Sequence, residues 1–351
     1  MLRRAMSRHR AEAEMARFRE RFVAGAVTQG VAEATAHEIF DKLAGFASYG
    51  FCKSHAAAFA RTAYDTLWLR AHFPAAYCCS VLNNEPMGFY APRVIVTDAR
   101  RHGVPIRAVH VNRSEAACTL ESATPDEMAI RLGFLYVDGL GETGAERLMT
   151  ARPTTGYTSL GDLCQRTRLP RRLVERLILA GGLDDWSSAS LPRDRRSLLW
   201  ELGRLRYQED ALPLPLPPDS VELEPMTYAE ELLAEYGSTG VAAQGHLMEL
   251  YRERLARARI GTSQTLAKAR HGERVQVAGF VVVRQQPPTA KGFAFFTLED
   301  EWGLMNVIVR PQVFTAQRAE WVGAVVLAVE GIVQRAHGRI NVLAERGQVI
   351  K

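Results

Sequence analysis

The chain has 351 residues, enough for two or three domains, and its 47% hydrophobic and 24% charged residues are typical of a soluble globular protein. No apolar run approaches the roughly 18 residues that a membrane span requires. The N-terminus contains arginines but lacks the apolar core of a signal peptide. The sequence therefore argues against a membrane protein and a secreted one.

The charge and the cysteines indicate the compartment and the kind of partner. A net charge of +5 and a pI near 9.0 favour a polyanionic partner. The five cysteines form no C-x-x-C pair and no zinc spacing. They are expected to be reduced thiols in a cytoplasmic protein.

Residues 1–84 are expected to be entirely helical. A first helix extends to about Ala26, a second covers Val31–Leu43, and a third starts with Ser54 as N-cap and closes at Pro74.

Three polar residues crowd the start of the third helix. Lys53, Ser54 and His55 lie where the free backbone N–H groups of a helix favour an anion. An ordinary capped helix would use the same cluster, with Lys53 in solvent and His55 packed. The residues alone leave both interpretations open.

The segments GFCKSHAAAFA and WLRAHFPAAY resemble the fingers of the bacterial DNA polymerase III alpha family. The block from Leu82 to Glu121, with MGFY and DARRHGV, resembles the error-prone, damage-tolerant branch of that family. Cys52-Lys53 departs from this branch, where a Pro-Glu pair is usual, so the branch's nucleotide selectivity is not carried over. The resemblance implies that the incoming nucleotide approaches Lys53, Ser54, His55 and Arg61, the last also a candidate template contact.

Residues 85–130 are expected to form a joining segment. A helix over Arg93–Arg101 precedes a short strand-like run over Val104–Val111. Arg100 and Arg101 end the helix, and cations at a solvated helix C-terminus need no further explanation.

Residues 131–210 contain the apolar-Gly-apolar-Gly turn of a helix-hairpin-helix. Glycines allow a tight turn close to a phosphate, and the N–H groups of the next helix, from about Thr143, would point at it. Such turns also connect helices without binding anything, but their position after these fingers favours DNA. The predicted contacts are Gly139, Gly141, Thr143, Gly144, Arg171 and Arg172.

Residues 211–225 are proline-rich and are expected to be an extended linker, followed by a helical connector over 226–270. Gln208, Leu212 and Leu214 faintly resemble peptides that dock on sliding clamps. A linker that docks nothing is the favoured interpretation.

Residues 271–351 change to the two-residue period of strands. Five strands, with a helix at about 312–320 after the third, predict an OB-fold barrel for single-stranded nucleic acid. Cations beside aromatic rings suit such a groove, and the predicted contacts are Arg284, Lys291, Phe293 and Trp302. At least one of Phe293 and Phe295 is expected to face the barrel core.

The predicted fold class is thus a multidomain, mainly α protein with a C-terminal all-β OB-fold barrel. A polymerase needs strand-borne carboxylates for two metal ions. Asp184-Asp185, Glu230-Glu231 and Glu299–Glu301 instead lie at positions expected to be solvated. The resemblance implies a Mg²⁺-dependent nucleotidyltransferase, but its PHP and palm domains have no counterpart here. We expect no cofactor in this chain and no catalysis by the chain alone.

Two functions agree with these observations. In the first, the chain is the C-terminal part of an error-prone DNA polymerase that contacts dNTP, primer-template DNA and single-stranded DNA beside a palm encoded elsewhere. A sliding clamp or damage-polymerase accessory proteins would then be further partners. In the second, it is a stand-alone, non-catalytic DNA-binding or scaffold protein. An in-frame or neighbouring palm upstream of Met1 would favour the first.

Overall fold

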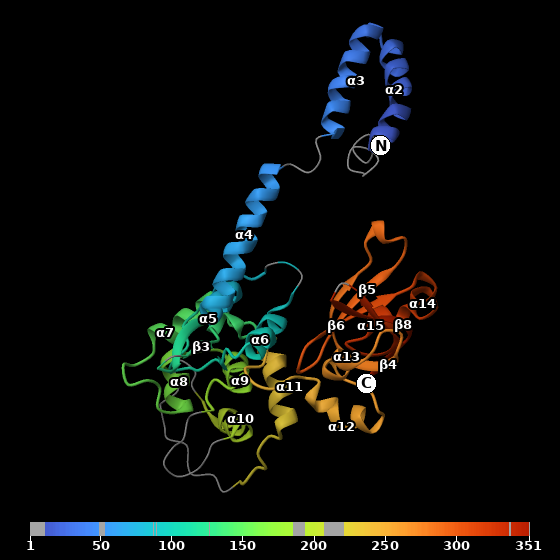
Figure 1. Cartoon of the computed structure of the whole chain (residues 1–351). Coiled ribbons are helices and arrows are strands. Elements are labelled where there is room, and N and C mark those ends of the chain that lie inside the picture. The colour runs from blue at the N-terminus through green and yellow to red at the C-terminus, as the bar shows by residue number, and fades with distance from the viewer. Residues whose placement is uncertain are drawn as a thin grey trace. The chain divides into compact units, whose positions relative to one another are not determined.

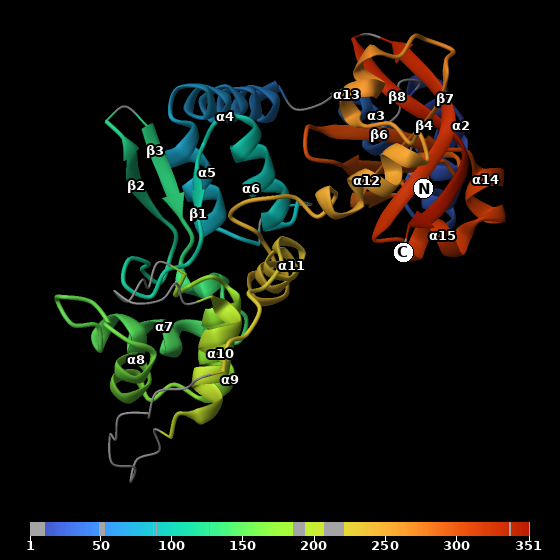
Figure 2. The ribbon, with the colours of Figure 1, turned by 90° about the horizontal axis from the view of Figure 1, so that it is seen from below.

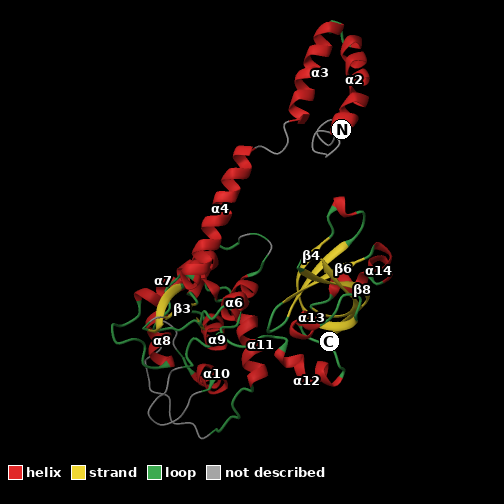
Figure 3. Cartoon of the chain, in the orientation of Figure 1, coloured by secondary structure: helices red, strands yellow, loops and turns green. Residues whose placement is uncertain are grey.

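A computed structural model describes residues 11–48, 53–86, 88, 90–125, 127–184, 194–206, 221–336 and 338–350 of the chain. The chain forms two compact units, Met1–His72 and Phe73–Lys351. Helices dominate the described chain up to the barrel at its C-terminal end (Figure 3). Among these residues, no helix combines the length and the apolar character needed to cross a membrane.

The described residues of the first unit form three helices, as the sequence predicts. Helices α2 (Ala11–Thr28) and α3 (Glu33–Ser48) lie side by side (Figure 1). The rings of Phe22 and Phe40 pack between them with their centroids 5.5 Å apart. Helix α4 covers Lys53–His72, close to the predicted third helix.

The second unit opens with two helices and a small sheet. Helices α5 (Pro74–Asn83) and α6 (Pro92–Arg101) both begin with proline, whose fixed φ suits the first helical position. The three strands are β1 (Ile106–Arg107), β2 (Thr119–Thr124) and β3 (Glu127–Arg131).

In this sheet β3 is the central strand, parallel to β1 and antiparallel to β2 (Figure 2). Strands β2 and β3 were not predicted. Strand β2 alternates between half-buried and exposed residues, so it lacks the strong apolar alternation that reveals a strand in sequence.

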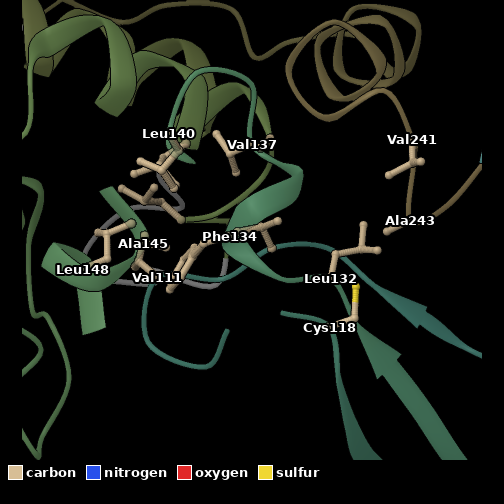
Figure 4. Packing of buried hydrophobic residues seen from close by; sticks show 14 of the residues in the cluster. Val111, Cys118, Leu132, Phe134, Val137, Leu140, Ala145, Leu148, Val241 and Ala243 are labelled. Carbon is tan, nitrogen blue, oxygen red and sulfur yellow. The ribbon is translucent and has the colours of Figure 1, made fainter. Parts of the chain in front are cut away.

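The helical module follows the sheet. It consists of a 3₁₀ turn η1 and helices α7 to α10, which cover Phe134–Tyr136, Gly141–Thr150, Leu160–Thr167, Arg171–Leu179 and Arg195–Arg204. Apolar side chains from these elements share one core with those of α5, α6 and the sheet. Figure 4 shows part of this core, including Phe134, Leu140 and Leu148.

Three further helices lead to the barrel: α11 (Tyr228–Thr239), α12 (Glu249–Arg257) and α13 (Ser263–Lys268). Thr227 accepts a hydrogen bond from the amide of Glu230, whose side chain accepts one from the amide of Thr227. This capping box fixes the start of α11, since it satisfies amides that the helix leaves unpaired.

The C-terminal residues form a closed five-stranded barrel in the order β4-β5-β6-β8-β7. The strands are Arg274–Gln285, Ala294–Glu299, Leu304–Val309, Val326–Ala336 and Arg339–Ile350, numbered β4 to β8 in sequence. A short turn η2 (Pro288–Ala290) precedes β5. Helices α14 (Pro311–Ala316) and α15 (Arg318–Gly323) lie between β6 and β7. This arrangement confirms the predicted fold class.

Strand β5 shows how the barrel fills its core. Ala294, Phe296 and Leu298 are buried, while Phe295 and Thr297 between them are half-buried on the other side. The ring of Phe296 lies 5.1 Å from that of Trp321. The expectation that Phe293 or Phe295 faces the core is therefore wrong, because alternation places Phe296 there.

Candidate nucleic-acid interface

The turn between η1 and α7 is the predicted hairpin. Val137 and Leu140 are buried and anchor it, whereas Gly139 and Gly141 are exposed, with φ of 76° and 60°. L side chains rarely adopt such values, so both positions depend on glycine. Helix α7 begins at Gly141, and its first amides have no carbonyl partner one turn earlier within the helix.

Gly144 has a different role from the phosphate contact predicted for it. It is buried in α7, and a Cβ there would lie 2.6 Å from Cδ1 of Leu140. Leu140 belongs to the same buried cluster as Ala145 and Leu148 (Figure 4). The missing side chain at Gly144 lets Leu140 close the hairpin.

Helix α9 brings Arg172 to the hairpin. Its Nη2 lies 3.8 Å from the position that a Cβ would take at Gly139, and Cδ2 of Leu173 lies 3.7 Å from the same point. Gly139 and Arg172 are both exposed. Two predicted contacts that are distant in sequence are therefore neighbours in space.

A groove of about 1190 Å³ runs beside α7 and the turn between α8 and α9, and we call it the arginine groove. Thr143, Arg147 and Thr150 line it from α7. The other lining residues are Glu146, Ala151, Arg166, Thr167, Arg168, Leu169, Pro170, Arg171, Leu205 and Arg206. The lining includes five arginines and one carboxylate, so the groove favours an anion.

Some of these arginines also have contacts within the protein. Arg166 Nε lies 2.5 Å from Oδ1 of Asp162, and Arg171 Nη2 donates to the Leu205 carbonyl at 2.9 Å. All five arginine side chains are exposed. Each guanidinium has five N–H groups, so these contacts leave donors for a phosphate.

The sequence analysis identified Thr143 and Arg171 in this groove but missed Arg147, Arg166, Arg168 and Arg206. One signal was available for Arg147, because it follows Thr143 by four residues and so shares its side of a helix. The groove positions of Arg166, Arg168 and Arg206 could not be predicted from the sequence, because they depend on how the turn before α9 packs against α7.

In the barrel, Arg284 is already used by the protein. Its Nε donates to the Trp321 carbonyl at 3.3 Å, and its Nη2 donates to the Ala324 carbonyl. Burial lowers its pKa below the ordinary value. The guanidinium thus satisfies carbonyls at the end of α15, but the side chain is exposed and has further N–H groups, so the DNA contact stays a prediction.

Lys291 and Phe293 lie just before β5 in the chain. Lys291 is exposed, and Phe293 and Phe295 are half-buried outside the core. Phe295 is the cross-strand partner of Ile308, and the exposed Arg310 follows the end of β6. This outer face of β5 and β6, with Lys291 and Arg310 beside it, combines cations and stackable rings.

Trp302 lies at the other end of β5, in the turn to β6. Its side chain is 44% exposed, and the guanidinium carbon of Arg252 lies 4.9 Å from the ring centroid. The sequence analysis grouped Trp302 with Lys291 and Phe293, but the length of β5 separates them.

The predicted nucleotide contacts lie on α4. The helix begins at Lys53, of whose side chain nothing is described, and Ser54 and His55 are exposed in its first turn. The His55 ring meets Phe59 edge-on at 4.5 Å between centroids. Arg61 Nε lies 3.0 Å from Asp65, a surface ion pair.

Several predicted features lie outside the described residues: Cys52, Asp185 and the clamp-peptide candidates Gln208, Leu212 and Leu214. Within the described residues, no group of three or more His, Cys, Asp or Glu could hold a metal ion. These residues therefore do not fit the Mg²⁺ of the family's chemistry.

A hairpin of paired glycines, a helix N-terminus and an arginine-lined groove define a protein of the helix-hairpin-helix class. The helix-hairpin-helix motif itself matches residues 103–196. Proteins named error-prone DNA polymerase are 39%, 37% and 40% identical to the chain in Anaeromyxobacter sp. (strain K), Methylococcus capsulatus and Azoarcus sp.. The matches cover 97%, 98% and 98% of this chain. The chain belongs to the error-prone DNA polymerase family.

The chain spans about a third of the length of these relatives: 30%, 34% and 32%. Asparaginyl-tRNA synthetase from Pyrococcus horikoshii is among the solved structures that align with part of the chain. That alignment is 26% identical, covers 26% of this chain and 23% of that one, and has a TM-score of 0.23. A score this low carries no argument.

Proposed function

We propose that this chain supplies DNA and nucleotide contacts to an error-prone DNA polymerase that copies damaged templates. In this proposal, the hairpin and the arginine groove hold the sugar-phosphate backbone of the primer-template duplex. Backbone contacts position a duplex without reading its sequence. A polymerase that copies damaged templates would need contacts of this kind, because they do not depend on intact template bases.

One observation carries the proposal. Thr143 in the first turn of α7, Arg147 on the same helix and Arg171 at the start of α9 line one groove. Helix N-termini and arginines are both phosphate-binding elements. Here two helix starts and five arginines supply them together, beside a hairpin whose glycines permit close approach.

The salt dependence of duplex binding tests this role. We expect Arg147→Ala and Arg172→Ala each to weaken binding equally for unrelated sequences. The slope of log K against log salt should fall by about 0.9 for each lost phosphate contact. The matched control is Arg257→Ala on α12, whose exposed side chain is paired with Glu253. Equal slopes in all variants would reject the interface.

The barrel supports a second contact, with single-stranded template. The outer face of β5 and β6 presents Phe295 and Ile308 as cross-strand partners, with Lys291 beside them. Strand-borne aromatics beside cations bind single strands with weak sequence preference.

The start of α4 is the proposed contact for the incoming nucleotide. Backbone amides of its first turn and the Lys53 ammonium would bind a phosphate, and His55 would donate to it. Losing one charge-assisted contact costs about 1.5–3 kcal/mol. The test is Lys53→Ala in a full-length relative that carries this segment, with Lys42→Ala on α3 as control. Unchanged half-saturating nucleotide concentration and maximal rate would leave Lys53 as a solvated charge.

A further inference from the structure

A second cavity, of about 450 Å³, lies where α6, the segment before α12 and the turn between β5 and β6 meet. Arg100 of α6, Gln264 of α13 and Trp302 of the turn contribute to its lining. The volume falls within the range of about 300–1,000 Å³ that small-molecule sites occupy.

The Trp302 ring offers a surface to this cavity. Its side chain is 44% exposed, and Arg252 covers the ring from a distance of 4.9 Å. Arg252 does not line the cavity, whereas Trp302 does. With 44% of its side chain exposed, Trp302 keeps accessible surface and is one of the residues that line the cavity.

The acidic side chains of the cavity already accept hydrogen bonds. Glu301 accepts from both Nε and Nη2 of Arg252, the former at 2.9 Å. Glu249 accepts from the hydroxyl of Tyr228 at 2.5 Å. The Arg252 guanidinium partly neutralises the charge of Glu301, and the Tyr228 hydroxyl donates a hydrogen bond to Glu249. Both carboxylates therefore repel an incoming anion less than free carboxylates would.

Polar groups that could recognise a nucleotide remain. Arg100 donates from Nη1 to the Gly245 carbonyl, and a guanidinium has five N–H groups. The Gln264 side chain is exposed, and an amide offers both a donor and an acceptor to the edge of a base. The hydroxyl of Thr97, a third lining residue, donates to the Arg93 carbonyl at 2.8 Å, so its lone pairs stay available.

We propose that this cavity is a subsite for one unstacked base of single-stranded DNA. The base stacks on Trp302, its edge meets Gln264, and Arg100 binds the adjoining phosphate. Aromatic stacking tolerates any base, which suits a template strand of arbitrary sequence. The subsite rests on the proposed DNA-binding function, and it adds a base-recognising position at the end of the barrel opposite to Lys291.

The test uses the full chain and two labelled oligothymidylates of about a dozen residues, one intact and one with abasic positions. We expect Trp302→Ala to lose about fivefold or more in affinity for the intact strand, as for one stacked base, and nothing for the abasic strand. Trp200→Ala, which removes a similarly exposed ring (47%) from α10, should change neither. Trp302→Phe keeps a ring and should retain most of the preference.

Duplex binding separates the two proposals. If the wild-type chain binds neither duplex nor single strand, the proposed function and the subsite both fail. If duplex binding persists and Trp302→Ala binds the intact strand normally, the subsite alone is overturned. Should Trp302→Ala fail to fold, the test instead compares how oligothymidylate quenches tryptophan fluorescence in the wild type and in Trp302→Phe. Quenching by oligothymidylate that is lost in Trp302→Phe supports stacking, and quenching that survives refutes it.

Discussion

Arg101 Nη1, in the last turn of α6, donates to Oε1 of Glu299 at the end of β5 across 3.1 Å. The Glu299 side chain is 1% exposed and that of Arg101 is 15% exposed. Nε2 of the buried His246 lies 3.8 Å from the other carboxylate oxygen. The pair joins the helical part of the second unit to the barrel, although the sequence analysis placed both residues in solvent.

Arg101→Ala should destabilise the protein by about 3–5 kcal/mol, because it leaves the buried Glu299 carboxylate without its guanidinium partner. Denaturant unfolding measures the loss. Arg257→Ala is the control, since it breaks an ion pair with side chains 77% and 80% exposed, which should cost less than about 1 kcal/mol. Similar losses in both variants would contradict the assignment.

Gly139→Ala should destabilise the hairpin by about 1–2 kcal/mol, because its φ of 76° is a left-handed conformation that L residues resist. Gly237→Ala tests the opposite case. This glycine is exposed inside α11, and apart from its own helix backbone and chain neighbours nothing lies within 4 Å of the position that a Cβ would take there. Alanine should therefore raise the free energy of unfolding by about 0.5–1 kcal/mol. In thermal unfolding, the melting temperature should fall for Gly139→Ala and rise for Gly237→Ala.

Arg284→Ala and Lys291→Ala should separate stability from binding. The first removes donors from the Trp321 and Ala324 carbonyls and should lower barrel stability by roughly 1–3 kcal/mol. The second should leave stability unchanged, weaken single-stranded DNA binding and reduce the salt slope by about 0.7. Anisotropy titrations over a salt series, paired with unfolding curves, measure both effects. The reverse pattern would return the DNA contact to Arg284.

The buried thiols should make stability fall at high pH. Burial raises the pKa of Cys164 to about 12 and that of Cys118 to about 11, whereas an unfolded thiol titrates near 8.5. Above that pH the unfolded chain loses protons that the native chain keeps, so the free energy of unfolding decreases. The stabilisation is complete below about pH 8 and lost as pH approaches the native values. Cys164→Ala should flatten this decrease between about pH 8.5 and 10, and an unchanged profile would exclude Cys164 as a source.

Metal removal should not affect DNA binding by this chain. Its proposed phosphate contacts are arginines and helix amides, and the described residues provide no metal-binding cluster. We expect equal affinities with EDTA and with Mg²⁺ at matched ionic strength. We also expect no primer extension by the chain alone, since two-metal catalysis requires a carboxylate set. Extension abolished by a substitution within this chain would overturn this prediction.

Local sequence determined much of the fold. Helix α4 and the strands of the barrel follow from apolar periodicity, and the hairpin follows from the spacing of Gly139 and Gly141, because these signals act over a few neighbouring residues. Similarity to the error-prone polymerases was also visible in contiguous segments.

The tertiary structure decided which side chains remain available. Arg284 donates to a carbonyl at the end of α15, and Glu299 is buried against Arg101. The missing side chain of Gly144 makes room for Leu140. From the sequence, Glu299 was expected to be solvated, and Arg284 and Gly144 were expected to contact DNA. The arginine groove likewise combines α7 with the turn before α9. Such contacts depend on packing between segments distant in the chain, and neither periodicity nor a short motif encodes that packing.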